Sequence, residues 1–143
     1  IYQYNNNSWS QIGSDIIGNA TGDYFGINIS ITESGTRIAI SDSNSKIYVY
    51  DYNGSDWNQI GGEISANLKK VVISKSGNRL IGSADYGNDY IKIYEYDNDS
   101  QDWKCYDSVG TELDSASVCQ EVYGSEDSQW TLSSDSFSTA KIS

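Results

Sequence analysis

The stretch GDYFGINISITESGTRIAIS, residues 22–41, contains two runs of alternating apolar residues separated by a glycine turn. The alternation predicts a strand over 25–32 whose isoleucine face is buried. The isoleucines of that face are Ile27, Ile29 and Ile31. The segment ESGT follows, where glycine favours a reversal of the chain. The run RIAIS, 37–41, then predicts a second strand, so the stretch is interpreted as part of a β-sheet and not as a catalytic site.

The next predicted strand, KIYVYDY at 46–52, carries large apolar or aromatic side chains on both of its faces. Ile47 and Val49 alternate with tyrosines, whereas a strand with one solvent-facing side would carry polar residues there. A sheet that contains this strand is therefore expected to be covered on both faces. A fourth strand is predicted to begin at Trp57, after an Asn-Gly turn.

The same pattern occurs three times along the chain. The segments IYQYNNNSWSQIG (1–13), KIYVYDYNGSDWNQIG (46–61) and YIKIYEYDNDSQDWKCY (90–106) align on their tryptophans, which are spaced by 48 and 46 residues. The segment ISITESGTRIAIS (29–41) recurs as VVISKSGNRLIGS (71–83), 42 residues later. A period in the forties is typical of β-propellers, in which each blade is a four-stranded antiparallel sheet.

The sequence thus predicts an all-β fold of β-propeller blades, in about two and a half repeats with a period of about 46 residues. The predicted organisation is a half blade at 1–16, complete blades at 24–62 and 68–108, and a divergent, Ser-rich and acidic segment at 109–143. That last segment is interpreted as a cap, a degenerate blade or a strand donated to another chain. Since typical propellers have about four to eight blades, we expect further blades of a longer polypeptide, or other protein chains, to complete the array.

Six aromatic residues hold prominent places in the repeats, and their positions predict packing between blades. They are Trp9, Trp57, Trp103, Tyr48, Tyr94 and Phe25. The alternative interpretation is an aromatic surface on which sugars stack. Arg37 and Arg79 each follow a turn glycine and are expected to tie one strand to a neighbouring carboxylate.

These motifs resemble the FG-GAP-type β-propeller repeat of large secreted or surface proteins of algae and marine microbes. The resemblance covers about residues 1–108 and depends on three motifs, W-x-Q-hydrophobic-G, G-D-x-F-G and S-x-x-G-x-R-hydrophobic-A. They are filled here by Trp9, Gln11, Ile12, Gly13, Gly22, Asp23, Phe25, Gly26, Gly35, Arg37 and Ala39. The second repeat reads SANLKK at 65–70, so its G-D-x-F-G motif is lost. Members of the wider family bind calcium in a D-x-D-x-D-G loop. The turns here read ESGT and KSGN, so the resemblance implies no calcium site.

Composition excludes several classes of function. The chain has 20 acidic and 9 basic residues, and the net charge of −11 disfavours nucleic acids and anionic membrane surfaces as partners. Histidine is absent, which excludes Ser-His-Asp and Cys-His nucleophile systems and histidine-ligated metals. We expect no catalytic residue, no cofactor and no bound metal. We also expect no membrane insertion, because no apolar run approaches the roughly 20 residues that span a bilayer.

Sequons of the form N-x-S/T fall in the same predicted hairpin of each repeat. Exposed hairpin tips are suitable for N-glycosylation, and the candidates there are Asn6, Asn53 and Asn98. Asn19, outside these hairpins, is a further candidate. Asn28 is a poorer acceptor because it alternates with isoleucines. The alternative is that asparagine serves only as a turn residue. The tips are also acidic, but Ca²⁺ binding is the weaker interpretation because the glutamate and glycine of a calcium loop are missing.

Cys105 and Cys119 are the only cysteines of the chain. A disulfide between them would close a loop of about 15 residues and stabilise the divergent segment by roughly 3 kcal/mol. The alternative is a pair of unpaired thiols.

The sequence favours a non-enzymatic, extracellular structural or adhesive module. Such a module would belong to a larger glycoprotein, or to a multi-chain assembly at the cell surface such as a filament. A carbohydrate-binding propeller is the alternative. A fragment of a propeller glycoside hydrolase is a third hypothesis, and it would require two converging carboxylates.

Overall fold

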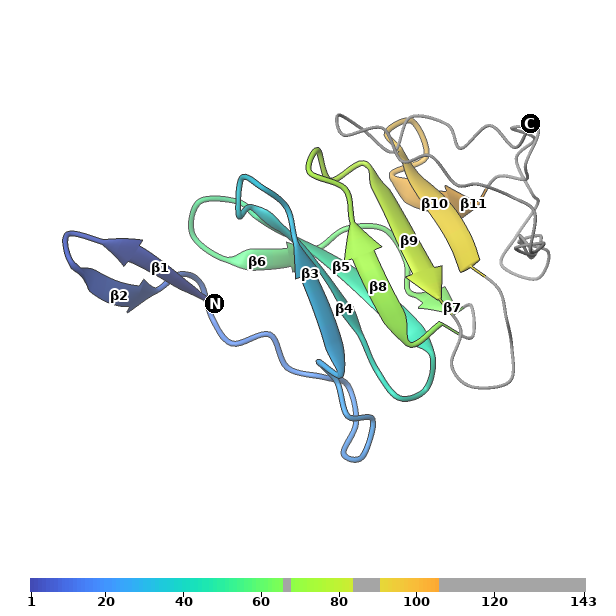
Figure 1. The fold of residues 1–143 in the computed structure, drawn as a ribbon, viewed down its shortest axis with the longest axis horizontal. Helices are drawn as coiled ribbons and strands as arrows, with labels where there is room; N and C mark the ends of the chain where they lie inside the picture. The colour runs from blue at the N-terminus through green and yellow to red at the C-terminus, as the bar shows by residue number, and fades with distance from the viewer. Residues whose placement is uncertain (66–67, 84–90, 106–143) are drawn as a thin grey trace, which may run out of the picture.

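The computed structural model describes residues 1–65, 68–83 and 91–105. Every regular element of this part is a β-strand and every strand pair is antiparallel, so the all-β prediction is confirmed there (Figure 1). The strands are β1 (Tyr2–Asn5), β2 (Ser8–Gln11), β3 (Asn28–Ile31), β4 (Arg37–Ser41), β5 (Lys46–Tyr52), β6 (Trp57–Gln59), β7 (Ile64–Ser65), β8 (Lys70–Ile73), β9 (Arg79–Ser83), β10 (Ile91–Asp97) and β11 (Asp102–Cys105). The predicted divergent segment, 109–143, lies outside the described residues.

The strands form two sheets of the same topology and a separate hairpin (Figure 1). The first sheet has the order β3-β4-β5-β6, and β7 adds to it by pairing with β5. The second sheet has the order β8-β9-β10-β11. Among the described strands, β1 and β2 pair only with each other, and no closed propeller is formed.

Strand register identifies which residues of the repeats are equivalent. Arg37 lies opposite Asp51 in the first sheet, and Arg79 lies opposite Glu95 in the second. A tyrosine of one strand also faces the repeated tryptophan of the next strand, with ring centroids 5.2–5.3 Å apart, in the pairs Tyr4–Trp9, Tyr52–Trp57 and Tyr96–Trp103. The hairpins β1–β2, β5–β6 and β10–β11 are therefore equivalent. By this register Tyr94 is equivalent to Tyr50. The 46-residue spacing in the sequence indicates Tyr48 instead, two residues earlier on the same strand.

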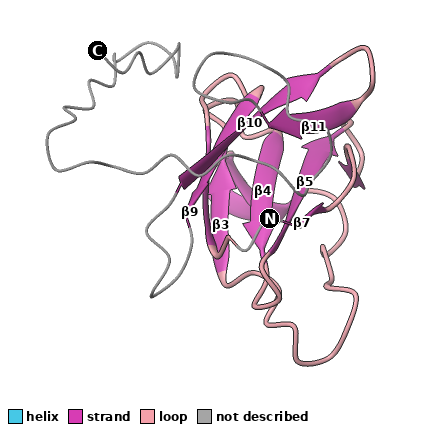
Figure 2. Cartoon of the chain, turned by 90° about the vertical axis from the view of Figure 1, so that its right-hand side faces the viewer, coloured by secondary structure: helices cyan, strands magenta, loops and turns pink. Residues whose placement is uncertain are grey.

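The two sheets stack face to face around the main core (Figure 2). Small and β-branched residues of β4 and β5 meet the apolar face of the second sheet, which includes the fully buried Leu80. The buried members of this core are Ala39, Ile47, Val49, Ile64, Leu68, Val71, Ile73, Leu80, Tyr94 and Trp103.

A second core covers the opposite face of the first sheet. Ile38, Ile40 and Trp57 are buried there, and residues of the N-terminal segment pack against them, including Ile12 and Ile16. The middle of the first sheet is therefore covered on both faces, as expected for a strand with apolar side chains on both sides.

The strand β3 corrects the prediction made from its alternating isoleucines. It begins at Asn28 and not at residue 25, because the amides of Gly26 and Ile27 both donate to the Ser41 carbonyl in a turn where Gly26 has a φ of 90°. Ile27, Ile29 and Ile31, expected to be buried, are 54%, 60% and 48% exposed. Asn28 and Ser30, which alternate with these isoleucines, face the second sheet instead.

Candidate functional site

A repeated contact joins each Asp-Trp dipeptide to the glycine of the preceding repeat. The Asp56 carboxylate accepts hydrogen bonds from the Ser14 amide at 2.8 Å and the Ser14 hydroxyl at 3.2 Å. The Trp57 indole Nε1 donates to the Ile12 carbonyl at 3.0 Å. The end of the first repeat is thereby fastened to β6 of the next.

The second sheet repeats this contact on the first. The Asp102 carboxylate accepts a hydrogen bond from the Gly62 amide at 2.9 Å. Trp103 takes the place of Trp57 and is equally buried, at 8% exposure, but its indole nitrogen has no hydrogen-bond partner among the described residues. A Cβ added to Gly61 would lie 2.8 Å from Trp103 Cδ1, so glycine is required where the ring packs on the backbone.

The electrostatics of this joint favour ionised carboxylates. Hydrogen bonds from the Ser14 and Trp57 amides lower the pKa of Asp56 below its usual value. At the β10–β11 hairpin, the Lys104 ammonium and then the Asp99 amide lower the pKa of Asp97 in the same direction. These carboxylates are therefore already engaged in turns and joints.

A second joint links the first strands of the two sheets through side chains. The outward amides of Val71 and Ile73 on β8 donate to Asn28 Oδ1 at 2.7 Å and to Ser30 Oγ at 3.0 Å on β3. Alternate polar residues of β3 thus satisfy the edge of the neighbouring sheet, and Asn28 has a structural partner.

Arg37 extends the joint across the turns. Its guanidinium binds both carboxylate oxygens of Asp51, at 2.5 and 2.7 Å. Its Nη1 also donates to the Gly77 carbonyl at 2.7 Å, and its guanidinium carbon lies 5.3 Å from the centre of the Tyr96 ring. The expectation that Arg37 ties a strand to a carboxylate is confirmed, and the Arg79 pair with Glu95 at 3.1 Å confirms it for the other repeat.

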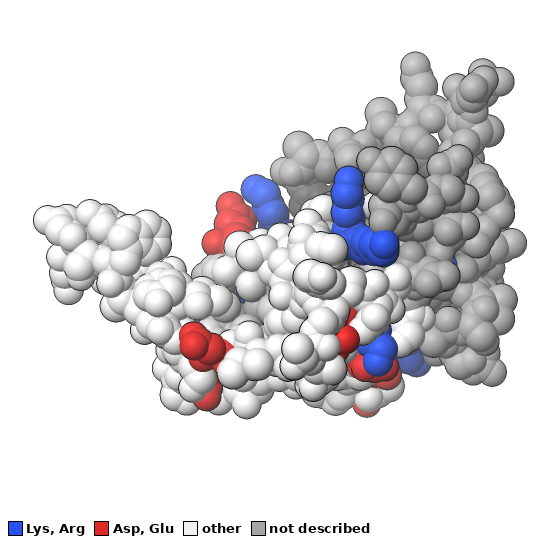
Figure 3. All heavy atoms as spheres, turned by 90° about the horizontal axis from the view of Figure 1, so that it is seen from below, with Lys and Arg blue, Asp and Glu red and all other residues white. Residues whose placement is uncertain are grey.

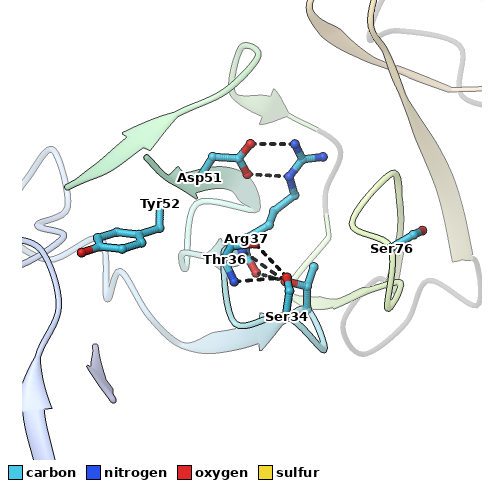
Figure 4. Close-up of a pocket in the computed structure, with 7 residues that line it drawn as sticks. Ser34, Thr36, Arg37, Asp51, Tyr52 and Ser76 are labelled. Carbon is cyan, nitrogen blue, oxygen red and sulfur yellow. Dashed lines mark hydrogen bonds and ion pairs between the residues drawn. The ribbon is translucent and has the colours of Figure 1, made fainter. Parts of the chain in front are cut away.

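A pocket of about 140 Å³ lies beside this arginine (Figure 4). Its lining is polar and consists of Thr32, Ser34, Thr36, Arg37, Asp51, Tyr52 and Ser76. Among these described residues the one carboxylate is Asp51, and both of its oxygens are bonded to Arg37. The pocket therefore offers no pair of carboxylates for acid–base work.

The β3 side of the first sheet lacks the cover that the equivalent part of the second sheet has. Val71 and Ile73 are 2% and 5% exposed because β3 and β4 pack on them, whereas the equivalent Ile29 and Ile31 are 60% and 48% exposed. We call the surface formed by Ile27, Ile29 and Ile31 the open face. It is the candidate interaction surface.

The N-terminal hairpin, β1–β2, also exposes apolar side chains. Tyr2, Tyr4 and Trp9 are 61%, 54% and 69% exposed, although Trp9 is equivalent to the buried Trp57 and Trp103. Residues 1–14 carry no charged side chain, and Figure 3 shows this hairpin without acidic or basic residues. The chain thus presents an aromatic, uncharged surface there.

The predicted glycosylation sites are exposed. Asn6, Asn53 and Asn98 lie in the turns of the three equivalent hairpins, and Asn19 lies in the loop before β3. Asn53 Oδ1 accepts hydrogen bonds from the Ser55 and Asp56 amides, both at 2.9 Å, so this asparagine does shape its turn. Glycosylation of the four stays a prediction.

The other predicted residues fall in different environments. Tyr48 and Tyr94 are buried at 4% and 5% exposure, and Phe25 is half-buried with its ring 5.6 Å from that of Tyr48. Cys105 ends β11 and packs against the main core. Its proposed disulfide partner, Cys119, lies outside the described residues, so that bond also stays a prediction.

The described residues form neither a metal-binding cluster nor a membrane-spanning helix. No group of three or more His, Cys, Asp or Glu in this part of the chain is placed to hold a metal ion. Within the same residues, no helix has the length and apolarity needed to cross a membrane.

Sequence reasoning missed the aspartates and the polar row that build the joints. The recurrence of Asp-Trp at 56–57 and 102–103 was a visible signal for the first. The role of Asn28 and Ser30 had no such signal, because the second repeat has Lys70 and Val72 at their places. Comparison with protein-family models and with curated proteins finds no match for the chain.

Proposed function

We propose that the chain is a non-enzymatic structural or adhesive module made of β-propeller-type repeats. In this proposal it acts outside the cell, as part of a larger glycoprotein or of a multi-chain assembly at the surface. The observation that carries it is the repeated joint, in which the aspartates Asp56 and Asp102 hold the preceding repeat in the same way. A chain whose repeated contact serves the stacking of units is suited to building an array.

The side chains that line the described pocket further support the proposal. A glycoside hydrolase needs two available carboxylates, whereas Asp51 is bonded by Arg37 through both oxygens. The exposed sequons at the three hairpin turns fit a secreted glycoprotein. The resemblance to FG-GAP-type repeats is consistent with the same role.

Native mass measurement on the protein purified from its source tests this function. We expect a particle heavier than the 15.8 kDa of this chain, either because the polypeptide contains further repeats or because several chains assemble. A stable particle of 15.8 kDa without partners would overturn the proposal.

A carbohydrate-binding module is the second candidate, and the exposed aromatic residues favour it. Tyr4 and Trp9 lie with their ring centroids 5.2 Å apart on the uncharged hairpin, an arrangement on which a sugar ring could stack. A glycan array tests it with Trp9→Ala. Binding that is lost in this variant supports the candidate, and the absence of glycan binding by the unmodified chain rejects it.

A further inference from the structure

We propose that the open face binds a β-hairpin of another repeat unit, which supplies hydrogen-bond acceptors at two alternate positions and an arginine at its turn. The inference rests on the proposed function, because it names the partner of the same array. It follows from comparing the two faces that the chain itself presents, of which one is covered and one is not.

The covered face defines what a partner provides. Val71 and Ile73 are buried by the hairpin β3–β4, and their amides find acceptors in Asn28 and Ser30. The same hairpin places Arg37 on the Gly77 carbonyl and over Tyr96. One β-hairpin thus contributes an apolar cover, two acceptors and a cation.

The open face has the same requirements with none of them met by the described residues. Ile29 and Ile31 occupy the places of Val71 and Ile73, and their amides point outward from β3 because register alternation pairs the intervening residues with β4. No side chain of the described part accepts a hydrogen bond from either amide.

The turn of β3–β4 has open space where the equivalent turn of the second sheet is contacted by Arg37. A Cβ added to Gly77 would lie 2.9 Å from Arg37 Cδ, but one added to the equivalent Gly35 meets no atom within 4 Å. Tyr52, equivalent to Tyr96, lies beside this turn and its amide donates to the Thr36 carbonyl. An arginine from a partner hairpin would therefore reach the Gly35 carbonyl and the Tyr52 ring.

The N-terminal hairpin corresponds to the last two strands of the sheet that would cover the open face. The strands β1 and β2 are equivalent to β5 and β6, the last two strands of a sheet, and they already bring Ile12 and Ser14 to the Asp-Trp joint. The strand that would pair with the other edge of β1, as β4 pairs with β5, is not among the described strands. The partner hairpin completes this sheet.

The test extends the full chain by a copy of its own residues 14–48 placed before Ile1, so that the added strands occupy the places of β3 and β4. Amide hydrogen exchange is measured at Ile29 and Ile31, with Val71 and Ile73 as internal references. We expect exchange at the first pair to slow by about tenfold or more, toward the reference rates. Unchanged rates in the folded extended chain would overturn the proposal.

A matched control carries Asn28→Leu and Ser30→Ala in the added copy only. It keeps the apolar cover and removes the acceptors, so we expect the protection of the Ile29 and Ile31 amides to be lost. Protection that survives in this control contradicts the assigned acceptors. An extension that stays unfolded beside an intact parent chain also counts against the proposal, since a complementary hairpin would gain stability from the open face.

Two further outcomes distinguish this inference from self-association of the chain and from the proposed structural function. If the unextended chain self-associates in sedimentation and thereby protects Ile29 and Ile31, the occupant is a second copy, which overturns the assignment to another repeat unit. If native material is a large assembly whose open face still exchanges rapidly, the inference fails while the structural function stands.

Discussion

At the scale of single residues, Arg37 joins the two sheets by binding a carboxylate of its own sheet and a carbonyl of the other. It binds Asp51 with two hydrogen bonds and the Gly77 carbonyl with a third. We expect Arg37→Ala to lower the free energy of unfolding by about 2 kcal/mol, because the remaining carboxylate loses charge-assisted bonds. Urea unfolding measures the change.

The control for this variant is Lys75→Ala. The pair of Lys75 with Glu33 is 3.5 Å long and its side chains are 74% and 70% exposed, so we expect a change below about 0.5 kcal/mol. Equal losses in the two variants would show that Arg37 has no special role in joining the sheets.

Trp57 and Trp103 form a natural pair for measuring one hydrogen bond. Both are 8% exposed, but only the Trp57 indole has a partner among the described residues, the Ile12 carbonyl. We expect Trp57→Phe to cost about 1 kcal/mol more unfolding free energy than Trp103→Phe, since both lose the same ring area. Denaturant titration of both variants decides, and a larger loss for Trp103→Phe would refute the assigned bond.

Asp56 makes the joint sensitive to acid. Because its pKa is lowered in the folded protein, its ionised form contributes stability above the usual value of 3.8, and this contribution is lost as the pH falls below that value. We expect the urea midpoint of the unmodified protein to fall more steeply between about pH 5 and pH 2 than that of Asp56→Asn, which accepts hydrogen bonds but does not titrate. Parallel curves would contradict the role of the charge.

At the scale of elements, the contact of β11 with the segment that follows β6 depends on a glycine. Gly61 and Gly35 have similar φ values of 66° and 70°, but a Cβ meets Trp103 at the first position and open space at the second. We expect Gly61→Ala to be less stable than Gly35→Ala by about 1–3 kcal/mol, because only the first adds overpacking to backbone strain. Thermal unfolding of the two variants gives the comparison. Equal stabilities would contradict the prediction, because they would show that the Trp103 ring moves aside at no cost in free energy.

The elements also show how far the sequence could predict the structure. The strands β4 and β5 match their predicted bounds, because apolar alternation and the flanking turns agree there. Alternation alone does not say which side of a strand is covered, and the prediction of a buried isoleucine face on β3 is therefore wrong. Val71 is buried and the equivalent Ile29 is exposed because a sheet packs on the first and none of the described sheets packs on the second. Such a difference depends on how the sheets stack and not on the sequence of either strand.

At the scale of the whole molecule, the described part is two stacked sheets and a hairpin with one side left open. Stacking units bury their faces against neighbours, so a terminal unit needs either a polar cap or another unit. The open face is apolar, with Ile27 54% exposed beside Ile29 and Ile31. An exposed patch of this kind is typical of an interaction site.

The Asp-Trp joint and the open face differ in whether the sequence alone could have predicted them. The Asp-Trp joint could be read from its recurrence in the sequence. The open face could not, because it is defined by the absence of a cover that the equivalent Val71 and Ile73 possess. Only a repeat seen twice in one structure provides that comparison.

The most direct test of the account is amide hydrogen exchange on the native assembly from its source, compared with the isolated chain. We predict that Ile29 and Ile31 exchange at least about tenfold more slowly in the assembly, at rates near those of Val71 and Ile73. Rates that are the same in both samples, with Ile29 and Ile31 as open in native material as in the isolated chain, would contradict it.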